Sequence, residues 1–345
     1  MSKPYRILII GPSWVGDMMM AQSLFLLLKE NKPDCHIDVL APGWSLPLLA
    51  HMPEVSEAIG SPFQHGEAGL RKRYLLGKSL RGSHYDQAII LPNSMKSALV
   101  PYWARIPLRT GFVGEMRYGL VNDARKLDRE ALPRTVMRFA SLSLPANQQL
   151  SDKIPSPHLE TDEKSVFASF AALNLGINDA PVLALCPGAE YGPAKQWPAK
   201  HFAQLANDRL EQGWQVWLLG SDKDMEVCTN IDLTTKGRCE NLAGKTELGQ
   251  VIDLMSQASA IVSNDSGLMH IAAALDKPLV AIYGSSDPGF TPPLSEKVEI
   301  LSLHLSCSPC FKRECPLGHL DCLNKLEPEI AGRAIDSLLE VKING

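Results

Sequence analysis

The sequence has no apolar run long enough to cross a membrane. A membrane-spanning helix needs about 20 apolar residues, and after the polar start the chain offers only Ile7 to Ile10 before Gly11-Pro12. That run is also too short for the apolar core of a signal peptide, which takes roughly 7 to 15 residues. We therefore expect a cytoplasmic protein that reaches a membrane only through peripheral contact.

A dense cysteine framework and a large net charge are also missing. Eight cysteines spread over 345 residues are too dilute for a small secreted domain held by disulfides. The net charge is −4, and the composition, 45% hydrophobic and 21% charged, is that of an ordinary soluble globular protein. The length suffices for two domains, each with its own core.

The first half alternates between strand-like and helix-like segments. An apolar strand over residues 5–10 leads through a glycine-bearing loop, 11–17, into a helix over 18–29. The alternation continues with strands at 36–40, 55–59 and 85–91 and helices at 44–50, 70–80 and 96–104. This pattern predicts a Rossmann-like α/β domain whose parallel sheet is covered by helices on both faces.

Asp17 stands where the first loop enters its helix, at the carboxyl edge of the predicted sheet. A carboxylate in that position commonly caps the helix, and this is its more frequent role. In an enzyme the same carboxylate can act as a general base, with its charge stabilised by the helix dipole. The sequence leaves both interpretations open.

Basic residues are concentrated within the first half. Residues 64–138 contain 14 Lys and Arg against 6 Asp and Glu, an excess of +8 that leaves −12 for the rest of the chain. Exposed helix faces account for some of these charges, and for a single residue such as Lys72 that is the default. An excess of this size indicates an anionic partner: nucleic acid, a phosphorylated sugar or an acidic membrane surface. We expect residues 109–117 to bind this anionic partner.

A polar stretch with two prolines, residues 147–162, predicts the linker to a second domain. The alternation then restarts, with strands at 182–186 and 214–219 and helices at 199–212 and 249–259. Lys195 follows two glycines on the first strand-to-helix connection, from which a lysine can reach a diphosphate. Asp222 follows the next strand, where a Rossmann fold places a carboxylate for a ribose hydroxyl.

The most informative stretch is residues 260–275, where an apolar strand end turns into a helix of small and apolar residues. The first amides of a helix lack internal partners and carry the positive end of its dipole, so this turn is a natural anion site. Asp265 or Ser266 would cap the helix, Gly267 permits close approach of a phosphate, and His270 lies one turn in, on the face of Ser266. The alternative is a capped helix with a buried histidine, but a second phosphate-type loop on the same sheet edge favours the anion site.

Five motifs together give the sequence a family resemblance. They are Gly11-Pro-Ser-Trp-Val-Gly-Asp-Met-Met-Met20, Leu91-Pro-Asn-Ser94 with Lys96-Ser-Ala-Leu99, Gly114-Glu-Met-Arg-Tyr-Gly119, Pro187-Gly-Ala-Glu190 with Gly192-Pro-Ala-Lys195, and Asn264-Asp-Ser-Gly-Leu-Met-His270. With these motifs, which span most of the chain, it resembles the ADP-heptose:lipopolysaccharide heptosyltransferases, GT-B fold enzymes of the lipopolysaccharide inner core. It is most similar to the heptosyltransferase II branch.

The resemblance implies two Rossmann-like domains whose parallel sheets face across a cleft. Residues 1–155 would bind the acceptor, residues 156–326 would bind ADP-heptose, and a terminal helix over 327–345 would pack back on the first domain. The implied reaction moves L-glycero-D-manno-heptose, with inversion, from ADP-heptose to the first heptose of the inner core. The implied acceptor is of the heptosyl-Kdo2-lipid A type, reached at the cytoplasmic face of the inner membrane, and no nucleic acid takes part.

The resemblance also distributes roles over the candidate residues. Asp17 would be the catalytic base, and Lys195 would stabilise the departing diphosphate. The donor site would comprise Glu190, Lys195, Asp222, Asp265, Ser266, Gly267 and His270, and the acceptor site would comprise Arg71, Lys72, Arg73, Asn93, Lys96, Arg109, Glu115 and Arg117. Where the related first heptosyltransferases place hydroxyl residues, this chain has Ala189-Glu190, so donor contacts there would come from backbone amides or Glu190.

Metal ions are expected only in a structural role. Asp222-Lys-Asp224 has the letters of a diphosphate-metal motif, but we expect it on the ribose side of the donor, so no obligatory metal is predicted for catalysis. A late cluster with one close pair could hold structural zinc, with His319 as a substitute ligand. Its members are Cys307, Cys310, Cys315 and Cys322. Their spacing is not that of a standard zinc ribbon or finger, and free thiols or disulfides stay open as alternatives.

Two other functions fit parts of the pattern. Heptosyltransferase I, or another ADP-sugar transferase of this fold, would share the donor loops. A non-enzymatic protein that binds a nucleotide sugar or nucleic acid would also have two Rossmann-like halves and a basic patch, but it would not need a carboxylate at Asp17. Transfer, as opposed to binding alone, separates that class from the enzymes.

Overall fold

The computed structural model describes residues 3–63, 66–146, 148–176 and 179–341. The chain divides into two compact units, Met1–Pro157 and His158–Gly345, named unit 1 and unit 2 below. The division falls two residues beyond the expected boundary, within the proline-bearing stretch.

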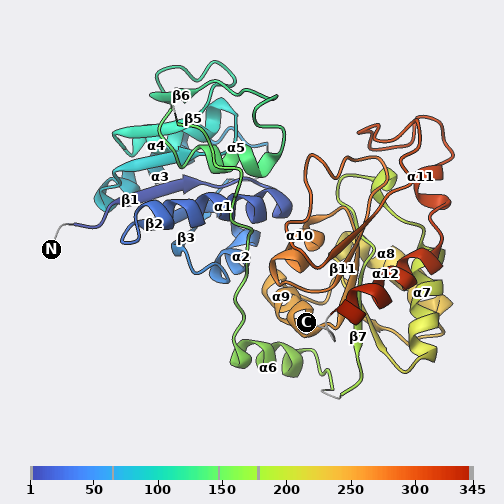
Figure 1. The fold of residues 1–345 in the computed structure, drawn as a ribbon. Helices are drawn as coiled ribbons and strands as arrows, with labels where there is room; N and C mark the ends of the chain where they lie inside the picture. The colour runs from blue at the N-terminus through green and yellow to red at the C-terminus, as the bar shows by residue number, and fades with distance from the viewer. Residues whose placement is uncertain (1–2, 64–65, 147, 177–178, 342–345) are drawn as a thin grey trace. The chain divides into compact units, whose positions relative to one another are not determined.

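Unit 1 is built on a six-stranded parallel sheet (Figure 1). Its strands lie in the order β3 (Val55–Ser61), β2 (His36–Pro42), β1 (Arg6–Ile10), β4 (Gln87–Ile90), β5 (Leu108–Phe112) and β6 (Asp123–Arg125). Its α-helices are α1 (Val15–Asn31), α2 (Leu46–Ala50), α3 (Leu70–Ser79), α4 (Leu99–Trp103) and α5 (Thr135–Ser141), and a 3₁₀ turn, η3 (Met95–Ala98), precedes α4.

Unit 2 repeats this architecture with another six-stranded parallel sheet. Its strands lie in the order β12 (Val298–Leu301), β11 (Leu279–Ile282), β10 (Ala260–Asn264), β7 (Val182–Cys186), β8 (Gln215–Leu218) and β9 (Glu240–Asn241). Its α-helices are α6 (Glu163–Ala172), α7 (Ala199–Glu211), α8 (Met225–Thr234), α9 (Leu248–Gln257), α10 (Gly267–Ala274), α11 (Asp321–Asn324) and α12 (Pro328–Val341), with 3₁₀ turns η4 (Pro193–Lys195) and η5 (Asp222–Asp224).

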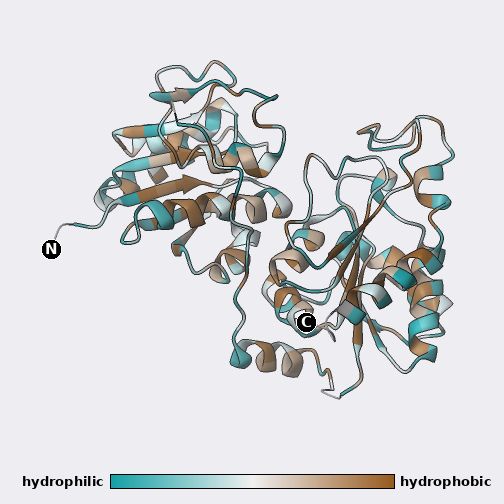
Figure 2. Ribbon diagram, viewed as in Figure 1, coloured by the Kyte–Doolittle hydropathy of each residue, from teal (hydrophilic) through white to brown (hydrophobic). Residues whose placement is uncertain are grey.

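Continuous apolar strands explain why both sheets are buried. The side chains of Ile7 to Ile10 in β1 are at most 7% exposed, and those of all five residues of β7 are buried as well. A strand covered by helices on both faces has this uninterrupted pattern, whereas a half-exposed strand alternates apolar and polar residues. Figure 2 shows the result, with hydrophobic strands inside each unit and helices of mixed character around them.

The strand order fixes where each sheet can hold a ligand. In both units the first strand, β1 or β7, lies beside the fourth, β4 or β10, and the chain builds outward from that pair in opposite directions. Loops at the carboxyl ends of such a central pair diverge, and ligands of doubly wound sheets collect in the crevice that they leave. The loops that follow these four strands are therefore the places to look for a site.

The terminal helix corrects one prediction. We expected the helix beginning near residue 327 to pack back on the first domain, but Ala331, Ala334 and Ile335 of α12 belong to the hydrophobic core of unit 2. Arg209 of α7 reinforces this packing, since it donates to the Gly332 carbonyl at 2.8 Å and to the Asp336 carboxylate at 2.7 Å. Figure 1 shows α12 beside α7 and β11. An apolar helix face is buried by the nearest sheet that leaves a strip uncovered, which sequence periodicity does not identify.

Candidate functional site

Lys195 and Asp265 meet at the central strand pair of unit 2. Lys195 ends the 3₁₀ turn η4 after β7, and Asp265 directly follows β10; the Lys195 Nζ and the Asp265 Oδ2 form an ion pair. The two side chains are 17% and 5% exposed. Ser286, which follows β11, donates its hydroxyl to the same Oδ2 atom. One buried carboxylate thus joins the ends of three neighbouring strands.

Tyr191 completes the surroundings of Lys195. Its ring centroid lies 5.1 Å from the Lys195 Nζ, close enough for a cation–π contact. A lysine has three N–H donors, and Asp265 takes one of them. A half-buried ammonium group that is oriented in this way, and has donors to spare, is suited to a phosphate oxygen.

His270 is held in its neutral form beside this pair. The pKa of His270 is lowered to about 4, mainly by burial; the Asp265 charge opposes the shift and the Lys195 charge adds to it. Near neutral pH the imidazole therefore adds hydrogen-bonding capacity to the site without adding charge.

The helix α10 begins without a side-chain cap. Ser266 is the N-cap residue, but its hydroxyl lies 3.2 Å from the Ser263 hydroxyl and makes no capping bond, while the Asp265 carboxylate is used by Lys195. The prediction that one of these side chains caps the helix is therefore wrong. The first amides of the helix, from Gly267 on, have no partner inside the helix. They are therefore available to hydrogen-bond an external anion.

Asp222 and Glu190 lie on the same edge but are more exposed. Asp222 opens the turn η5 after β8, and Glu190 lies in the loop after β7. The Glu190 carboxylate pairs with the ammonium group of Lys223, and these two side chains are 49% and 72% exposed. The structure thus brings both residues to the rim of the site and gives Glu190 a partner that the sequence did not suggest.

Asp17 occupies the equivalent position in unit 1, in the first turn of α1 directly after β1. Trp14 is the N-cap residue of α1, and within the described part of the chain no hydrogen bond or ion pair engages the Asp17 carboxylate. The helix-cap interpretation of Asp17 is therefore not supported. Burial raises the pKa of Asp17 to about 6, which suits a carboxylate that must accept a proton near neutral pH.

The loops after β4 and β5 are fastened to each other beside this position. The Glu115 carboxylate accepts the Met95 N–H at 2.8 Å, and the Arg117 Nη2 donates to Asn93 Oδ1 at 3.3 Å. Asn93 is exposed and Lys96 is half-buried. Asn93 and Lys96 follow β4, the strand beside β1, and Glu115 is hydrogen-bonded to the same loop, so all three lie in loops at the carboxyl edge that Asp17 also occupies.

Arg117 itself is not available to a ligand. It is 2% exposed, and its guanidinium group donates to the Pro92 carbonyl at 2.6 Å and the Phe112 carbonyl at 2.6 Å. Arg109 likewise donates to the carbonyls of Ile106 and Leu120, both at 2.6 Å. We predicted that these two arginines grip an anionic partner, and the structure shows instead that they hold neighbouring loops together.

Helix α3 carries the other predicted basic residues. Arg73 is 7% exposed and donates to the carbonyls of Ala68 and Lys96, so it too has a structural role. Arg71 and Lys72 are exposed, and Lys72 pairs with Glu67 at 2.8 Å. Of the predicted acceptor-binding cations, Arg71, Lys72 and Lys96 therefore remain accessible.

The four late cysteines are half-buried free thiols that line a common cavity with Ala194, Ser285 and His319. Backbone N–H groups, led by that of Leu320, lower the pKa of Cys315. Within the described ranges, no group of three or more His, Cys, Asp or Glu side chains is arranged to hold a metal ion.

Sequence reasoning missed two members of the site, Ser286 and Tyr191. Ser286 lies just past an apolar run, Leu279–Ile282, so its position at a strand end was detectable. Tyr191 lies inside a loop already singled out for its glycines. Neither contact, to Asp265 or to Lys195, has a sequence signature, because both depend on which strands are neighbours.

Comparison with known proteins decides the family. The model of glycosyltransferase family 9 (heptosyltransferase) matches residues 73–321, which is most of the chain. The chain belongs to this family. As a family 9 glycosyltransferase it is an enzyme, as its sequence motifs predicted.

Named relatives and a solved structure agree with this assignment. Lipopolysaccharide heptosyltransferase 2 of Salmonella typhimurium is 47% identical over 345 residues, covering 97% of this chain and 98% of the relative, and its Escherichia coli K12 counterpart is 46% identical over 343 residues, with the same coverage. The structure of E. coli ADP-heptose lps heptosyltransferase II superposes with a TM-score of 0.89 at 44% identity, covering 98% of this chain and 99% of that one. The predicted GT-B class, with two Rossmann-like domains on parallel sheets, is confirmed.

No helix in the described part of this family 9 enzyme combines the length and the apolar character that a membrane span requires.

The pKa of Asp17 makes a prediction about stability. A carboxyl whose pKa is raised from about 4 to about 6 favours the protonated form in the folded state, so ionisation costs folding free energy that accumulates between pH 4 and pH 6. Asp17→Asn removes that cost and should raise the free energy of unfolding by about 2 to 3 kcal/mol at pH 7, with little gain at pH 4. Urea unfolding at both pH values measures the difference.

The exposed Asp34→Asn is the matched control and should show no such pH-dependent gain. Equal stability of wild type and Asp17→Asn across this pH range would contradict the raised pKa.

Proposed function

We propose that this chain transfers L-glycero-D-manno-heptose from ADP-heptose to the first heptose of the lipopolysaccharide inner core, as heptosyltransferase II does. The observation that carries the proposal is the convergence of Lys195, Asp265, Ser286 and the uncapped start of α10 at the central strand pair of unit 2. Such a constellation fits a diphosphate, which is the charged part of an ADP-sugar. The names of the relatives that match over nearly the full chain give a heptosyl group and lipopolysaccharide, and the name of the matched E. coli structure gives ADP-heptose.

The donor is proposed to bind with its diphosphate against Lys195 and the first amides of α10. Asp265 keeps the ammonium group oriented, and neutral His270 offers a hydrogen bond to a phosphate or sugar oxygen. Asp222, at the next strand end, is proposed to meet the ribose. Glu190 is a further candidate for donor binding at the rim of the site. Its carboxylate would release the Lys223 ammonium group and accept a hydrogen bond from a hydroxyl of the donor.

The chemistry follows from these positions. Asp17 takes the proton from an acceptor hydroxyl as its oxygen attacks the anomeric carbon, and the bond from that carbon to the diphosphate oxygen breaks with inversion. The negative charge that appears on departing ADP is stabilised by Lys195 and the α10 amides, which are already oriented. No step assigned here to these residues requires a metal ion.

The direct test is transfer itself. Purified protein incubated with ADP-heptose and a truncated core acceptor ending in one heptose should yield an acceptor heavier by one heptose, detected by mass spectrometry. Transfer only to an acceptor that lacks the first heptose would favour heptosyltransferase I, and donor binding without any transfer would favour a non-enzymatic role.

Asp17→Asn should lower turnover by roughly two to four orders of magnitude, the usual range for a lost general base, while ADP affinity stays nearly unchanged. Since the pKa of Asp17 is raised to about 6, kcat/KM of the wild type should rise through that pH as the carboxylate ionises. Turnover close to wild type in this variant would leave Asp17 without a catalytic role.

Lys195→Ala should weaken ADP binding by roughly 10- to 100-fold, the loss expected for a hydrogen bond to a charged group, and should also lower turnover, because the diphosphate gains charge in the transition state. Titration calorimetry with ADP measures the first effect. Lys200→Ala removes an exposed lysine from the neighbouring helix α7 and is the matched control. Unchanged ADP affinity in Lys195→Ala would show that the donor does not bind at this edge of the sheet.

We propose further that α3 contacts an anionic surface, either the phosphorylated acceptor or the membrane in which it is anchored. The exposed face of this helix combines Leu70 and Leu75, 60% and 53% exposed, with Arg71 and Lys72. Apolar and cationic side chains on one exposed helix face are typical of peripheral membrane contact.

The double change Arg71→Glu and Lys72→Glu should weaken binding to anionic lipid vesicles at least about tenfold, since each basic residue near such a surface contributes about 1 kcal/mol. Sedimentation with anionic and zwitterionic vesicles measures the effect, which added salt should reduce. Lys200→Glu with Arg333→Glu makes the same charge change on exposed residues of unit 2 and should not weaken binding. Salt-independent binding would argue against an electrostatic contact at α3.

A further inference from the structure

Residues 307–322, named the cysteine loop below, gather four thiols around one cavity. Cys307, Cys310, Cys315 and Cys322 all line it, and all four are free thiols. The remaining cysteines, Cys35, Cys186, Cys228 and Cys239, are buried in the two cores. Of the four late thiols only Cys322 packs against a core, that of unit 2, so hydrophobic packing does not explain why all four surround one cavity.

A buried hydroxyl lines the same cavity. Ser285 is 1% exposed, and its Oγ finds no hydrogen-bond partner among the residues that the structure describes. A hydroxyl is seldom buried without a partner, because burial then costs roughly 1 to 3 kcal/mol. A thiolate sulfur in this cavity would accept a hydrogen bond from it.

We propose that the four cysteines of the cysteine loop bind one zinc ion as a tetrathiolate site. Thiolates select zinc and iron among the common divalent cations, and four of them make a closed tetrahedral structural site. Binding displaces the four thiol protons and leaves a net charge of −2 on the zinc and its ligands. Lys312 and Arg313 of the same loop are balanced by Glu314 and Asp321, so the loop adds no further net charge, and the Ser285 hydroxyl donates a hydrogen bond to a sulfur.

The cavity favours four sulfur ligands over His319. The His319 Nδ1 already accepts the Asp321 N–H at 2.9 Å, where α11 begins. The four sulfurs are not at ligand spacing in the structure, so rotation of half-buried side chains toward the shared cavity must complete the site. Leu320 and Cys322 pack against the core of unit 2 and hold the end of the loop, so the movement falls to the partly exposed side chains of Cys307, Cys310 and Cys315.

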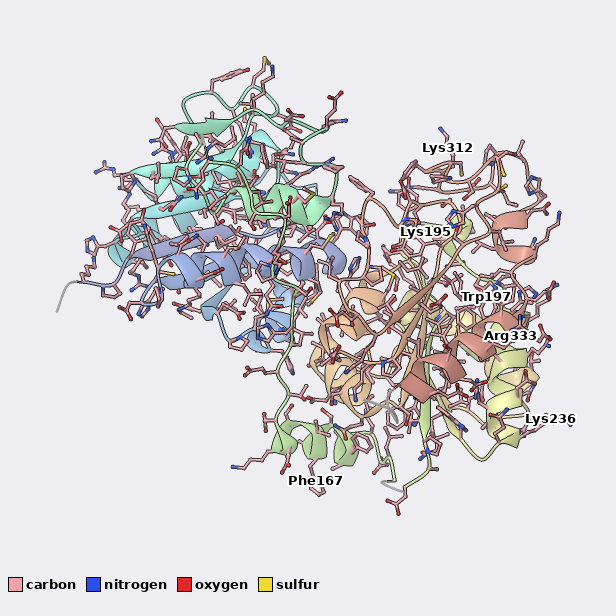
Figure 3. The ribbon with its side chains drawn as sticks, viewed as in Figure 1. Phe167, Lys195, Trp197, Lys236, Lys312 and Arg333 are labelled. Atoms are coloured by element: carbon pink, nitrogen blue, oxygen red, sulfur yellow. The ribbon has the colours of Figure 1, made fainter. Side chains whose placement is uncertain are left out.

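The cysteine loop is fastened to the donor loop through backbone atoms. Ala194 N–H donates to the Arg313 carbonyl at 3.0 Å, and the Tyr191 hydroxyl donates to the Phe311 carbonyl at 2.8 Å. A Cβ placed on Gly192 would lie 2.7 Å from the Arg313 oxygen, so the two backbones are in close contact. Figure 3 shows Lys195 and Lys312 at the same end of unit 2.

These contacts give the zinc ion a role at the donor site. Tyr191 and Ala194 are the loop residues that flank Lys195, and the Arg313 guanidinium lies 5.2 Å from the Tyr191 ring on which Lys195 also rests. The Phe311 N–H, in addition, donates to the Ser285 carbonyl at 2.7 Å, beside the Asp265 partner Ser286. Zinc thus acts as a positioning element for Lys195, an inference that rests on the proposed donor site.

Elemental analysis of the full-length protein, purified without a metal-binding tag, should find about one zinc per chain. Cys310→Ser and Cys315→Ser should each lose it, while Cys239→Ser, which alters a cysteine outside the loop, should keep it. Cobalt substitution should give the visible spectrum of a tetrahedral tetrathiolate. Zinc-free protein with eight reactive thiols, or with disulfides among these four cysteines, would overturn the site, and iron at the same stoichiometry would overturn the choice of metal.

Removing zinc with a chelator from the intact protein should weaken ADP binding roughly tenfold. This is the size of effect that follows when residues that orient the direct ligands of a metal site are mutated, and added zinc should restore ADP binding. Circular dichroism before and after removal checks that the fold persists. ADP affinity independent of zinc would overturn the positioning role. If the zinc-loaded wild type did not bind ADP, the proposed donor site would fail, while the metal analysis would still decide the tetrathiolate.

Discussion

The buried carboxylate of Asp265 is the constraint on which the proposed donor site depends. A charge that is only 5% exposed is stable in a protein interior when it is paired and hydrogen-bonded, and Asp265 obtains both from Lys195 and Ser286. Those partners follow β7 and β11, the strands on either side of β10. The need to satisfy one carboxylate therefore sets the positions of three loops, and it leaves the start of α10 uncapped.

In unit 1 the corresponding constraint is the burial of arginines. Arg73, Arg109 and Arg117 direct their guanidinium groups at backbone carbonyls of neighbouring loops, where water cannot serve as the acceptor. Part of the basic excess of this half therefore holds loops together, and a count of charges overstates what a ligand meets. The cations left exposed on α3 stand beside exposed leucines, which is the basis of the anionic surface contact proposed above.

The two units use the same strand order for different chemistry. At the central pair of unit 1 a carboxylate with a raised pKa has no ion-pair or hydrogen-bond partner among the residues that the structure describes, whereas at the equivalent pair of unit 2 a carboxylate is neutralised by a lysine. The first arrangement suits proton transfer, and the second suits binding of a diphosphate. The fold provides the location, and the immediate neighbours of each carboxylate decide its function.

The sequence by itself determined the strands, the α/β class and the loops at the strand ends. Ile7 to Ile10 and Val182–Cys186 are apolar without interruption, and Asp17, Lys195 and Asp265 each follow such a run, so their placement at a sheet edge is encoded within about ten residues. The motifs that indicated the family are likewise short runs of neighbouring residues. Tertiary structure decided the partners: Asp265 with Lys195 and Ser286, Arg117 with the loops after β4 and β5, and α12 with unit 2. These pairings join residues up to 127 positions apart along the chain, as Arg209 and Asp336 are, and they exist only because strand order makes distant segments neighbours, which no local pattern of residue types records.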